Sequence, residues 1–406
     1  MKNLLFVSIA FPPKSDPECL QTAKYYYYLQ KLKSLNIEVL TSAVPTLFMP
    51  VDNNLKRYDT GYTNKVELEI PENKYLNYIL RSIFKNGIDW PDSKNAFHRQ
   101  WKKVVSKIVQ KPDVIYSRSF PLSSTVMGLR MQEYYNIPWI MHLSDPWLLS
   151  PIDYYSKKQF EYHKKLERIC VEKASYVCLT SVLTIEMYKK EYPEFAHKFL
   201  YYPNVYDIQD FVENPYTFEN KIKIVYTGGL VGARNILPLL AGLRILKQKA
   251  PAYLSMFDFI FAGVMDSQSS TILSQQEFDN IRHVGILHYQ DALKLQRTAD
   301  ILLVIDNPIA EPEKAVFFPS KLLDYLMMQR KIMAITTPGG TTDSVLKTVN
   351  GISLAHNNAE KIADKLIEIA EAFKRKEVEF FKLDSLVPDY SAEHNAKRLL
   401  DLINSL

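Results

Sequence analysis

The sequence predicts an α/β protein made of two doubly wound units, each with a parallel sheet that helices cover on both faces. Two observations lead to this fold class. Apolar runs of strand length alternate with helical segments along both halves of the chain. The chain also has 406 residues, of which 47% are hydrophobic, and this is enough for two domains with a core each.

The first half alternates candidate strands with candidate helices. Strands are expected at 4–10, 38–41, 114–117, 139–143 and 176–180, and helices near 18–34, 122–134 and 181–191. The apolar start is too short for a signal peptide, and Pro12 and Pro13 take the place of a cleavage site, so we expect a buried first strand. The three cysteines lack metal-like spacing and are typical of buried thiols in a reducing compartment. These features favour a cytoplasmic protein.

The second half repeats the alternation. Strands are expected at 222–227, 257–262, 301–305 and 332–336, and helices near 236–249, 290–298, 321–328 and 359–374. Residues 204–221 carry prolines, acids and amides without a period, which is typical of a linker between domains 1–203 and 222–388. A last helix near 392–403 follows Pro388, and we expect 389–406 to pack back on the first domain. No run of about 18 apolar residues predicts a membrane span.

Ligands in open α/β sheets bind beyond the carboxyl ends of the strands, and two such units imply a cleft. The residues that follow the predicted strands are polar, aromatic or small. They are 11–16 after the first strand, 144–147 after the strand at 139–143, 228–230 with Arg234, Gly263, and 306–308. This composition favours a phosphate-binding or sugar-binding site.

The segment 317–340 is the most informative of these loops. It reads F-F-P-S-K-L-L-D-Y-L-M-M-Q-R-K-I-M-A-I-T-T-P-G-G. Ser320 can cap a helix, and the N–H groups of Ser320, Lys321 and Leu322 have no partner inside that helix, so a phosphate is favoured there, with Lys321 adding a charge. Asp324 lies one turn later on the same face, where it could accept hydrogen bonds from ribose hydroxyls. The alternative is an exposed ion pair between Lys321 and Asp324.

The order of short motifs extends over nearly the whole chain. The motifs are F-P-P at 11–13, S-D-P-W at 144–147, Y-P-N-V at 202–205, Y-T-G-G-L at 226–230 with Arg234, H-V-G at 283–285, A-D-I-L-L-V-I at 299–305 and P-S-K-L-L-D-Y-L at 319–326. In this order and spacing the chain resembles glycosyltransferases of the GT-B fold. It is most similar to the family-4 group of retaining, metal-independent enzymes with nucleotide-sugar donors.

The resemblance implies two Rossmann-like domains facing a cleft, with the acceptor side in the first domain and the donor side in the second. It implies that Asp324 binds the donor ribose, that Ser320 and Lys321 lie at the diphosphate, and that Arg234 neutralises the leaving group. The donor-binding residues implied by it are Gly228, Gly229, Arg234, His283, Gly285, Pro319, Ser320, Lys321, Leu322 and Asp324. The acceptor-side residues are Pro13, Lys14, Ser15, Asp16, His142 and Asp145, and the catalytic residues are Asp145, Arg234 and Lys321.

Two departures from the family pattern concern the same site. Family-4 enzymes often carry two acids eight positions apart, but Val316 stands eight positions before Asp324, and Glu311 and Glu313 are out of register. Ser15 and Asp16 stand where two glycines are common, so close approach of that backbone to a phosphate is less favoured. These departures leave the donor sugar and the catalytic assignment open.

Cleavage of a sugar–diphosphate bond develops negative charge on the leaving phosphate, which Arg234, Lys321 and the helix that begins near Ser320 can stabilise. There is no D-x-D cluster, so we expect neither a metal ion nor another cofactor. Each residue also has a structural interpretation: Asp145 as a turn former before Pro146, Arg234 as a solvated residue ahead of a helix, and His142 as a packed histidine.

The net charge is only +5, but the stretch 74–111 is strongly basic. It holds nine lysines and arginines against Asp89 and Asp92, interleaved with aromatic and aliphatic residues. Such a surface favours contact with an anionic membrane face, and the alternative is a solvated basic helix. A second basic cluster at 157–168 could extend it. No nucleic-acid module accompanies it, so we do not expect a nucleic-acid partner.

The function expected from these features is a glycosyltransferase of hexosyltransferase type. It would move a sugar from a nucleotide sugar to a glycan or lipid-linked acceptor in bacterial-type surface polysaccharide biosynthesis, in the cytoplasm with peripheral contact to the inner membrane face. Two alternatives stay open: a nucleotide-sugar epimerase on the same fold, and a catalytically weak GT-B-like protein that binds glycan or membrane as an assembly component.

Overall fold

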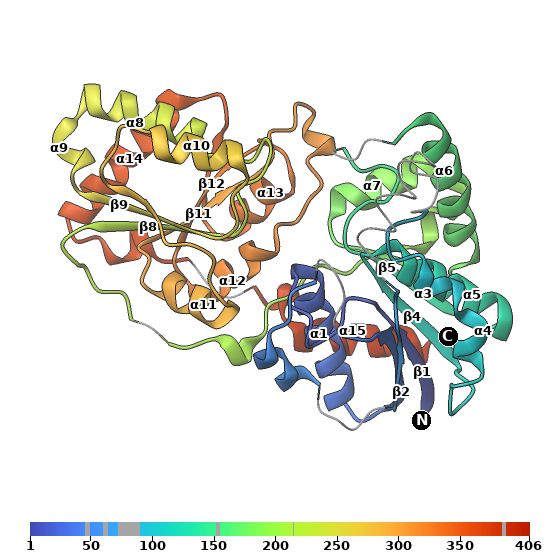
Figure 1. Ribbon diagram of the computed structural model, residues 1–406. Helices are drawn as coiled ribbons and strands as arrows, with labels where there is room; N and C mark the ends of the chain where they lie inside the picture. The colour runs from blue at the N-terminus through green and yellow to red at the C-terminus, as the bar shows by residue number, and fades with distance from the viewer. Residues whose placement is uncertain (45–48, 60–63, 72–89, 152–154, 214, 384–386) are drawn as a thin grey trace. The chain divides into compact units, whose positions relative to one another are not determined.

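The structure, a computed structural model, describes residues 1–44, 49–59, 64–71, 90–151, 155–213, 215–383 and 387–406. The chain divides into two compact units: the first is 1–207 together with 389–406, and the second is 208–388. Each unit contains one parallel β-sheet with helices on both faces (Figure 1). The α/β class with two doubly wound sheets, predicted from the sequence, is confirmed.

The sheet of the first unit has seven strands in the order β3-β2-β1-β4-β5-β6-β7. The strands are β1 (Lys2–Val7), β2 (Leu35–Ser42), β3 (Asn64–Leu68), β4 (Val114–Ser119), β5 (Trp139–Leu143), β6 (Tyr176–Leu179) and β7 (Phe199–Tyr201). The helices are α1 (Pro17–Lys31), α3 (Ala96–Arg99), α4 (Trp101–Val105), α5 (Leu122–Tyr135), α6 (Lys157–Lys173), α7 (Val182–Glu191) and α15 (Ala392–Asn404), with 3₁₀ turns η1 (Asn53–Tyr58) and η2 (Pro193–Lys198).

Strand β1 is apolar along its length because both of its faces are buried. Leu4 and Phe6 pack in the core beneath α1 and α15, whereas Leu5 and Val7 pack in the core on the α5 side. Successive side chains of a strand point to opposite faces, so a strand covered on both sides needs an uninterrupted apolar run. Helix α15 lies along α1, which places the end of the chain in the first unit (Figure 1).

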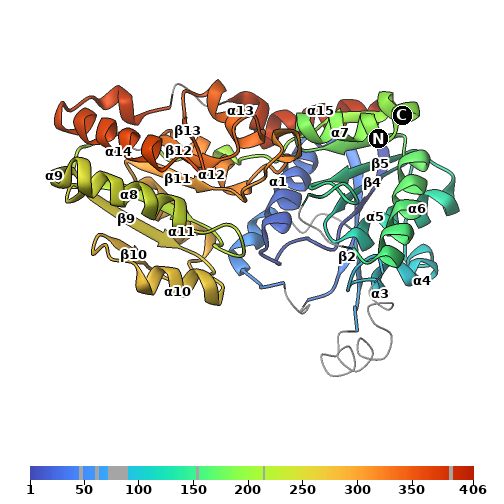
Figure 2. The same cartoon turned by 90° about the horizontal axis from the view of Figure 1, so that it is seen from above.

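The sheet of the second unit has six strands in the order β10-β9-β8-β11-β12-β13. These are β8 (Ile222–Thr227), β9 (Phe257–Ala262), β10 (Ile281–His283), β11 (Ile301–Ile305), β12 (Lys331–Thr336) and β13 (Ile352–Ala355). The helices are α8 (Leu237–Lys249), α9 (Pro251–Leu254), α10 (Ser267–Gln275), α11 (Tyr289–Arg297), α12 (Ser320–Met328), α13 (Thr341–Thr348) and α14 (Ala359–Lys374), with 3₁₀ turns η3 (Ile208–Asp210), η4 (Pro312–Lys314) and η5 (Val378–Phe381). Helices α8 and α14 pack against each other on one face (Figure 2).

The predicted strands are present, with some changes at their ends. Strand β1 ends at Val7 rather than Ala10, because the Ser8 amide still bonds Leu40 but the Ile9 amide turns to the hydroxyl of Ser124. The prediction lacked β3, β7, β10 and β13, which are the edge strands of the two sheets.

Both sheets have the strand order of the classic dinucleotide-binding fold, in which the chain starts in the middle and then builds outward on each side. The direction of building reverses between β1 and β4 in the first unit, and between β8 and β11 in the second. Loops diverge at such a switch point and leave a crevice at the carboxyl ends of the strands. Gly228, Arg234 and Lys321 lie at the second of these places, whereas His283 and Gly285 lie at the end of the edge strand β10.

Candidate functional site

In the second unit, Lys321 lies beside the loop that follows β8. Its ammonium group donates a hydrogen bond of 2.6 Å to the hydroxyl of Tyr226 and lies 3.8 Å from the centre of that ring. A Cβ atom added to Gly228 would lie 2.7 Å from Lys321 Nζ, so the lysine occupies the space that the glycine leaves. The sequence separates these residues by more than 90 positions, and the fold brings them together at the switch point.

Glycine is required at the ends of β8 and β9 for conformational and steric reasons. Gly228 has φ +131° and Gly263 has φ +135°, which side chains rarely adopt. A Cβ on Gly263 would lie 2.1 Å from the carbonyl oxygen of Gly228. The two backbones therefore touch here, and the loop after β8 is held close to the sheet by the hydrogen bond from the Gly228 amide to Ala262.

Arg234 follows the same loop and lines a small pocket with Asp306, at the end of β11, and Thr336, at the end of β12. Its Nε atom is buried and, among the residues that the structure describes, has no hydrogen-bond partner. A buried donor without an acceptor costs free energy, which a bound anion would recover. The arrangement fits an anion at this pocket.

Lys321 is perturbed by its surroundings. Burial lowers the pKa of Lys321 well below its ordinary value, and the guanidinium of Arg234 lowers it further, against the opposing effect of Asp306. Placing an anion near a lysine favours its charged form. A phosphate group in this region would therefore raise the pKa of Lys321 back toward its ordinary value.

Helix α12 begins one residue earlier than the sequence indicated. Pro319 is the N-cap and makes no side-chain capping bond, so Ser320 is the first helical residue rather than the cap. The Leu322 amide donates to the carbonyl of Pro319 at 2.9 Å, which corrects the expectation that this amide has no partner. The amides of Ser320 and Lys321 lie in the first turn, where a helix offers no internal acceptor.

Asp324 lies one turn into α12 and is half-buried. Its Oδ1 accepts a hydrogen bond of 3.1 Å from the hydroxyl of Tyr289, the first residue of α11. The same hydroxyl lies 3.3 Å from Oδ2 of Asp210 in η3. Among the described residues, the Lys321 ammonium bonds the Tyr226 hydroxyl and forms no ion pair with Asp324.

The H-V-G segment lies at the end of the edge strand β10. The His283 side chain is exposed, and its Nε2 lies 2.9 Å from the carbonyl oxygen of Gly263. Gly285 has φ +85°, and its carbonyl accepts from the Gly263 amide. These contacts place the segment next to the β9 end, so His283 and Gly285 border the same edge of the sheet as Gly228.

The departures around Val316 have a structural account. Val316 is buried, 1% exposed, so its position belongs to the core beneath the loop before α12. Glu311 is exposed and pairs with Lys314 at 2.7 Å, and Glu313 is exposed in η4. Neither Glu311 nor Glu313 therefore takes the place of the acid that the family pattern carries at the position of Val316.

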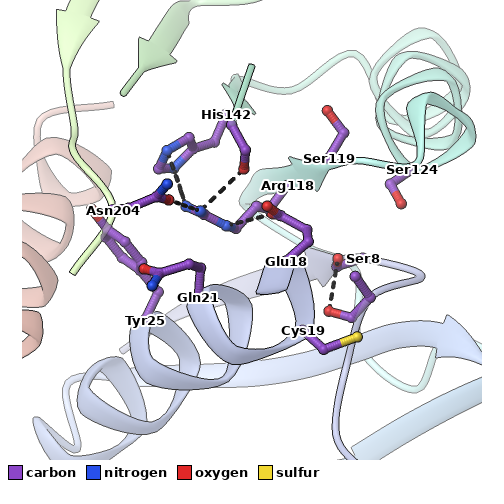
Figure 3. Close-up of polar contacts among 12 residues, drawn as sticks. Ser8, Glu18, Cys19, Gln21, Tyr25, Arg118, Ser119, Ser124, His142 and Asn204 are labelled. Carbon is purple, nitrogen blue, oxygen red and sulfur yellow. Dashed lines mark hydrogen bonds and ion pairs between the residues drawn. The ribbon is translucent and has the colours of Figure 1, made fainter. Parts of the chain in front are cut away.

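In the first unit, the switch point is organised by Arg118, which lies one residue before the end of β4 and is fully buried. Figure 3 shows its guanidinium among residues from α1, β5 and the segment after β7. Nε donates to Glu18 at 2.8 Å, and Nη2 donates to Asn204 at 2.9 Å and to Ser144 at 3.1 Å. Nη1 lies 3.0 Å from Nε2 of His142.

Glu18 is the part of this cluster that reaches the surface, with a side chain 15% exposed. Burial raises its pKa to about 7; the guanidinium of Arg118 and the Ser144 hydroxyl act in the opposite sense, and the carboxylates of Asp16 and Asp145 add to the rise. Asp145, which follows β5, is therefore an electrostatic neighbour of Glu18. The predicted acceptor side thus contains two neighbouring acids, one of which, Glu18, pairs with the buried arginine.

Three predicted acceptor-side residues have structural roles. Lys14 is fully buried, and its ammonium donates to the carbonyl of Ser42 at 2.7 Å, so it is not available to a ligand. His142 is also fully buried, and its Nδ1 lies 2.7 Å from the Tyr116 hydroxyl; burial and Arg118 lower its pKa well below the ordinary value. Asp16 caps α1 by accepting the Cys19 amide at 2.8 Å.

The other two predicted residues of that loop border its surface. Ser15 donates its hydroxyl to the carbonyl of Pro50 at 3.2 Å, and the Pro13 carbonyl accepts the amide of Asp52. Both are half-buried. The backbone here is bonded to the loop at 50–52 rather than open to a phosphate, in agreement with the missing glycines.

The loop that carries Asp145 is anchored by hydrogen bonds to buried side chains. The Trp147 amide donates to the hydroxyl of Tyr188 at 3.0 Å, and its indole nitrogen donates to His163 at 2.8 Å. Glu167 accepts hydrogen bonds from Tyr188 and from Tyr192, the latter at 3.0 Å. This network anchors the residues directly after Asp145 to α6 and α7.

Sequence reasoning missed Glu18, Arg118, Tyr226 and Tyr289. One signal was available for Arg118, since an arginine inside an otherwise buried strand must be paired and therefore marks a polar cluster. The others carry no such signal, because a glutamate or tyrosine in the first turn of a helix, as at Glu18 and Tyr289, and a tyrosine in a strand, as at Tyr226, are all common. Their partners are identified only by the fold.

Among the described residues, no group of three or more histidine, cysteine, aspartate or glutamate side chains could hold a metal ion. In that same part of the chain, no helix is long and apolar enough to cross a membrane.

Comparisons with known proteins bear on the fold. No protein-family model and no curated protein matches the chain. Among solved structures, sucrose-phosphate synthase from Thermosynechococcus elongatus is 14% identical with a TM-score of 0.65, over 100% of this chain and 99% of that one. A Staphylococcus aureus TarM variant in complex with Fondaparinux, alpha-GlcNAc-glycerol and UDP is 10% identical with a TM-score of 0.63, over 100% of both chains.

A putative UDP-N-acetylglucosamine 2-epimerase from Listeria monocytogenes is 12% identical with a TM-score of 0.59, over 99% of this chain and 96% of that one. At such identities the likeness concerns the fold, and it extends over the full length of the chain. The chain therefore has the GT-B fold that the order of its motifs predicts.

Proposed function

We propose that the protein is a glycosyltransferase that transfers a sugar from a nucleotide-sugar donor to a hydroxyl group of an acceptor. One observation carries the proposal: Lys321, Arg234 and the first turn of α12 converge at the carboxyl edge of the second sheet, with Asp324 one turn further along α12. This is the charge pattern that a nucleoside diphosphate requires, with cations and amides for the phosphates and a carboxylate for the ribose.

The proposed chemistry follows from where charge develops. When the bond between the sugar and the diphosphate breaks, negative charge grows on the leaving oxygen, and fixed positive charge near that oxygen lowers the barrier. Lys321 and Arg234 are candidates for this role. Retention of configuration and independence of metal ions are proposals that rest on the resemblance to family-4 enzymes.

On the acceptor side, the proposal assigns Asp145 to a hydroxyl of the acceptor or of the transferred sugar. Support comes from its position after β5 and its proximity to Glu18. A glycan or lipid-linked glycan of a bacterial-type surface polysaccharide is the acceptor class that we propose.

A thermal-shift panel tests the proposal. UDP-, GDP-, ADP-, TDP- and CMP-sugars are added to the wild type, Asp324→Ala, Arg234→Ala and the control Arg244→Ala, whose side chain pairs with Glu277 on the surface of the same unit. A ligand that binds only the folded state raises the melting temperature. We expect one nucleotide class to stabilise the wild type and the control but neither site variant. Absence of any shift with folded protein would refute a nucleotide-sugar enzyme and favour the assembly-component alternative.

An epimerase is a second candidate, because a putative epimerase shares the fold over almost all of the chain. The two functions differ in their products. A transferase consumes the donor faster when an acceptor is present and releases the nucleotide, whereas an epimerase changes the sugar without any acceptor. Proton NMR spectra of the donor, recorded in the presence and in the absence of a mixture of bacterial envelope glycolipids, distinguish the transferase from the epimerase.

We also propose peripheral contact with an anionic membrane through α4 and α6. Lysines 102 and 103 of α4 are exposed, and α6 exposes Lys157, Lys158, Lys164, Lys165 and Arg168 around Phe160, which is 39% exposed. The opposite face of α6 is buried through His163, Glu167 and Cys170, so the basic side chains share its outer face. Residues 74–89 of the predicted basic stretch lie outside the described residues.

Vesicle co-sedimentation tests this contact. The wild type should bind vesicles with 30% phosphatidylglycerol and not pure phosphatidylcholine vesicles, and binding should weaken as salt is added. Charge reversal of Lys157, Lys164 and Arg168 to glutamate should abolish binding. The matched charge reversal of Lys247, Lys249 and Lys361, which are exposed on the second unit, should leave vesicle binding unchanged. Equal loss in both triple variants would contradict a docking role for α6.

A further inference from the structure

The small pocket that Arg234 lines is also lined by the first acid after β11. Asp306 directly follows the last residue of that strand and lines the pocket together with Asn307 and Thr336. The remaining walls are Ile309, Ala315, Phe317 and Thr337. The volume of the pocket is about 20 Å³, which is room for one water-sized group. A ligand can therefore place only a small substituent in this space.

Asp306 is fixed in place by polar contacts of its side chain and backbone. Its Oδ2 accepts a hydrogen bond of 2.7 Å from the Thr336 hydroxyl, its amide donates to the Ile335 carbonyl at 3.0 Å, and its carbonyl oxygen lies 2.9 Å from Nε2 of His356. No described residue donates a hydrogen bond to the other carboxylate oxygen, Oδ1. One oxygen of a rigidly held carboxylate is thus left to accept from a ligand.

Arg234 and Asp306 line the same pocket without pairing. Among the described residues, the buried Nε atom of Arg234 has no hydrogen-bond partner, and the two side chains form no ion pair with each other. The pocket therefore offers a donor on one wall and an acceptor on another. A hydroxyl group satisfies both, since it can accept one hydrogen bond and donate one. A phosphate oxygen in the same space could only accept, and it would meet the negative charge of Asp306.

The pocket is close to the proposed phosphate site. Burial lowers the pKa of Lys321, and the negative charge of Asp306 acts against this effect. Arg234 can serve both sites, because a guanidinium carries five N–H donors and its Nε uses only one of them. The transferred sugar is bonded directly to the phosphate that Arg234 is proposed to stabilise. A pocket that shares this arginine is therefore within reach of the hydroxyl groups of that sugar.

We propose that the pocket between Arg234 and Asp306 binds one hydroxyl group of the transferred sugar, with Arg234 Nε donating to its oxygen and Asp306 Oδ1 accepting its hydrogen bond. The inference rests on the proposed function and goes beyond it, because it names a residue pair that selects the sugar. The substituent that enters is a free hydroxyl group, since an acetamido group exceeds the space of one water-sized group. Asp306 also brings an acid to a site whose loop carries the buried Val316.

Calorimetry with sugar-bearing and sugar-free ligands tests the inference. The ligands are the nucleoside diphosphate of the class that stabilises the wild type, its gluco, galacto and manno conjugates, and the 2-, 3-, 4- and 6-deoxy forms of the conjugate that binds tightest. They are titrated into the wild type and Asp306→Asn, which keeps the size of the side chain and removes its charge. The control is Asp258→Asn, the same change at an acid of β9 that pairs with the exposed Arg282. Urea unfolding of each free protein shows whether the variants keep their stability.

We expect Asp306→Asn to weaken binding of the tightest conjugate at least tenfold, the effect of one hydrogen bond to a charged group, without weakening binding of the sugar-free diphosphate. One deoxy form should lose a similar factor with the wild type. That loss should disappear in Asp306→Asn, because both changes remove the same contact. Asp258→Asn should change none of the dissociation constants.

Three results would overturn the inference and leave the proposed function intact. Asp306→Asn could weaken the diphosphate and the conjugate alike, which would indicate a structural role. It could leave binding of every conjugate unchanged, which would indicate that the pocket holds only water. Each deoxy form could lose the same factor with the variant as with the wild type, which would exclude a hydroxyl contact at Asp306. Absence of binding by any nucleotide to the wild type would overturn both the inference and the proposed function.

Discussion

Replacement of Gly263 by alanine should strongly destabilise the second unit. Gly263 directly follows β9 with φ +135°, and the added Cβ would lie 2.1 Å from the oxygen and 2.5 Å from the carbon of the Gly228 carbonyl. Both neighbours are backbone atoms, so no side chain can rotate away. The ends of β8 and β9 would have to separate, which strains the hydrogen bond of 2.7 Å from the Gly228 amide to Ala262.

The magnitude has three contributions. A backbone conformation that suits only glycine costs about 1–3 kcal/mol for another residue. Overpacking of a tight contact costs about 1–3 kcal/mol more, and the weakened hydrogen bond about 1 kcal/mol. We therefore expect a loss of roughly 3–7 kcal/mol, a large share of the roughly 5–15 kcal/mol that stabilises a typical protein.

Two other glycines separate the contributions. Gly232 has φ +64° with no atom within 4 Å of an added Cβ, so Gly232→Ala should cost only about 1–2 kcal/mol for the left-handed conformation. Gly228 has φ +131°, but its Cβ would meet the flexible end of Lys321. Gly228→Ala should therefore be intermediate in stability and should displace the lysine, so that nucleotide binding weakens.

Urea unfolding followed by circular dichroism gives the free energies. Hydrogen exchange of peptides from β8 and β9 shows whether the loss is in the second unit. The expected order of destabilisation is Gly263→Ala, then Gly228→Ala, then Gly232→Ala. If Gly263→Ala is no less stable than Gly232→Ala, the close approach of the two strand ends is not what requires glycine, and the reasoning fails.

Three further predictions concern the two switch points and the buried network around Glu167. Arg118→Met should lower the free energy of unfolding by about 3–5 kcal/mol in urea titrations, because it leaves buried polar partners without a donor; a loss below about 1 kcal/mol would contradict this. Burial raises the pKa of Glu167 to about 7, so the protonated form stabilises the fold below pH 4.5, and this stabilisation is lost as the pH rises through 7. Glu167→Gln should remove about 3 kcal/mol of that pH dependence, seen as the difference between the two proteins' stability profiles. Lys321→Met should raise the dissociation constant for the nucleoside diphosphate at least tenfold by calorimetry, whereas unchanged affinity would exclude Lys321 from the phosphate site.

The inner strands of both sheets were predictable because each is buried on both faces and reads as an apolar run. The four strands that the prediction lacked are the edge strands, and they are short: β7 and β10 have three residues each. An edge strand is covered by one neighbour only and can carry charged residues, as β3 does in the sequence N-K-V-E-L. Its place in a sheet depends on the partner strand, which local sequence does not contain.

The donor side was more predictable than the acceptor side for a similar reason. Ser320, Lys321 and Asp324 lie within five consecutive positions, so their arrangement on one helix can be worked out from the helical repeat. Glu18, Arg118 and Asn204 lie on three separate segments and meet only because α1, β4 and the end of the sheet converge at the switch point. The sequence also does not show which way a side chain points, and Lys14 and His142 point into the core.

The two switch points differ in how their cations are used. In the first unit, the guanidinium of Arg118 is surrounded by acceptors from four residues, so its positive charge is satisfied inside the protein. The groups that remain near the surface are the acids Glu18 and Asp145. In the second unit, the positive charges of Lys321 and Arg234 repel each other, and a donor atom of Arg234 has no partner among the described residues. Acids suit the hydroxyl groups of a sugar acceptor, and unsatisfied cations suit phosphates. A transferase needs one surface of each kind, whereas an epimerase that acts on its donor alone needs only the second, so the acids of the first unit favour transfer to an acceptor.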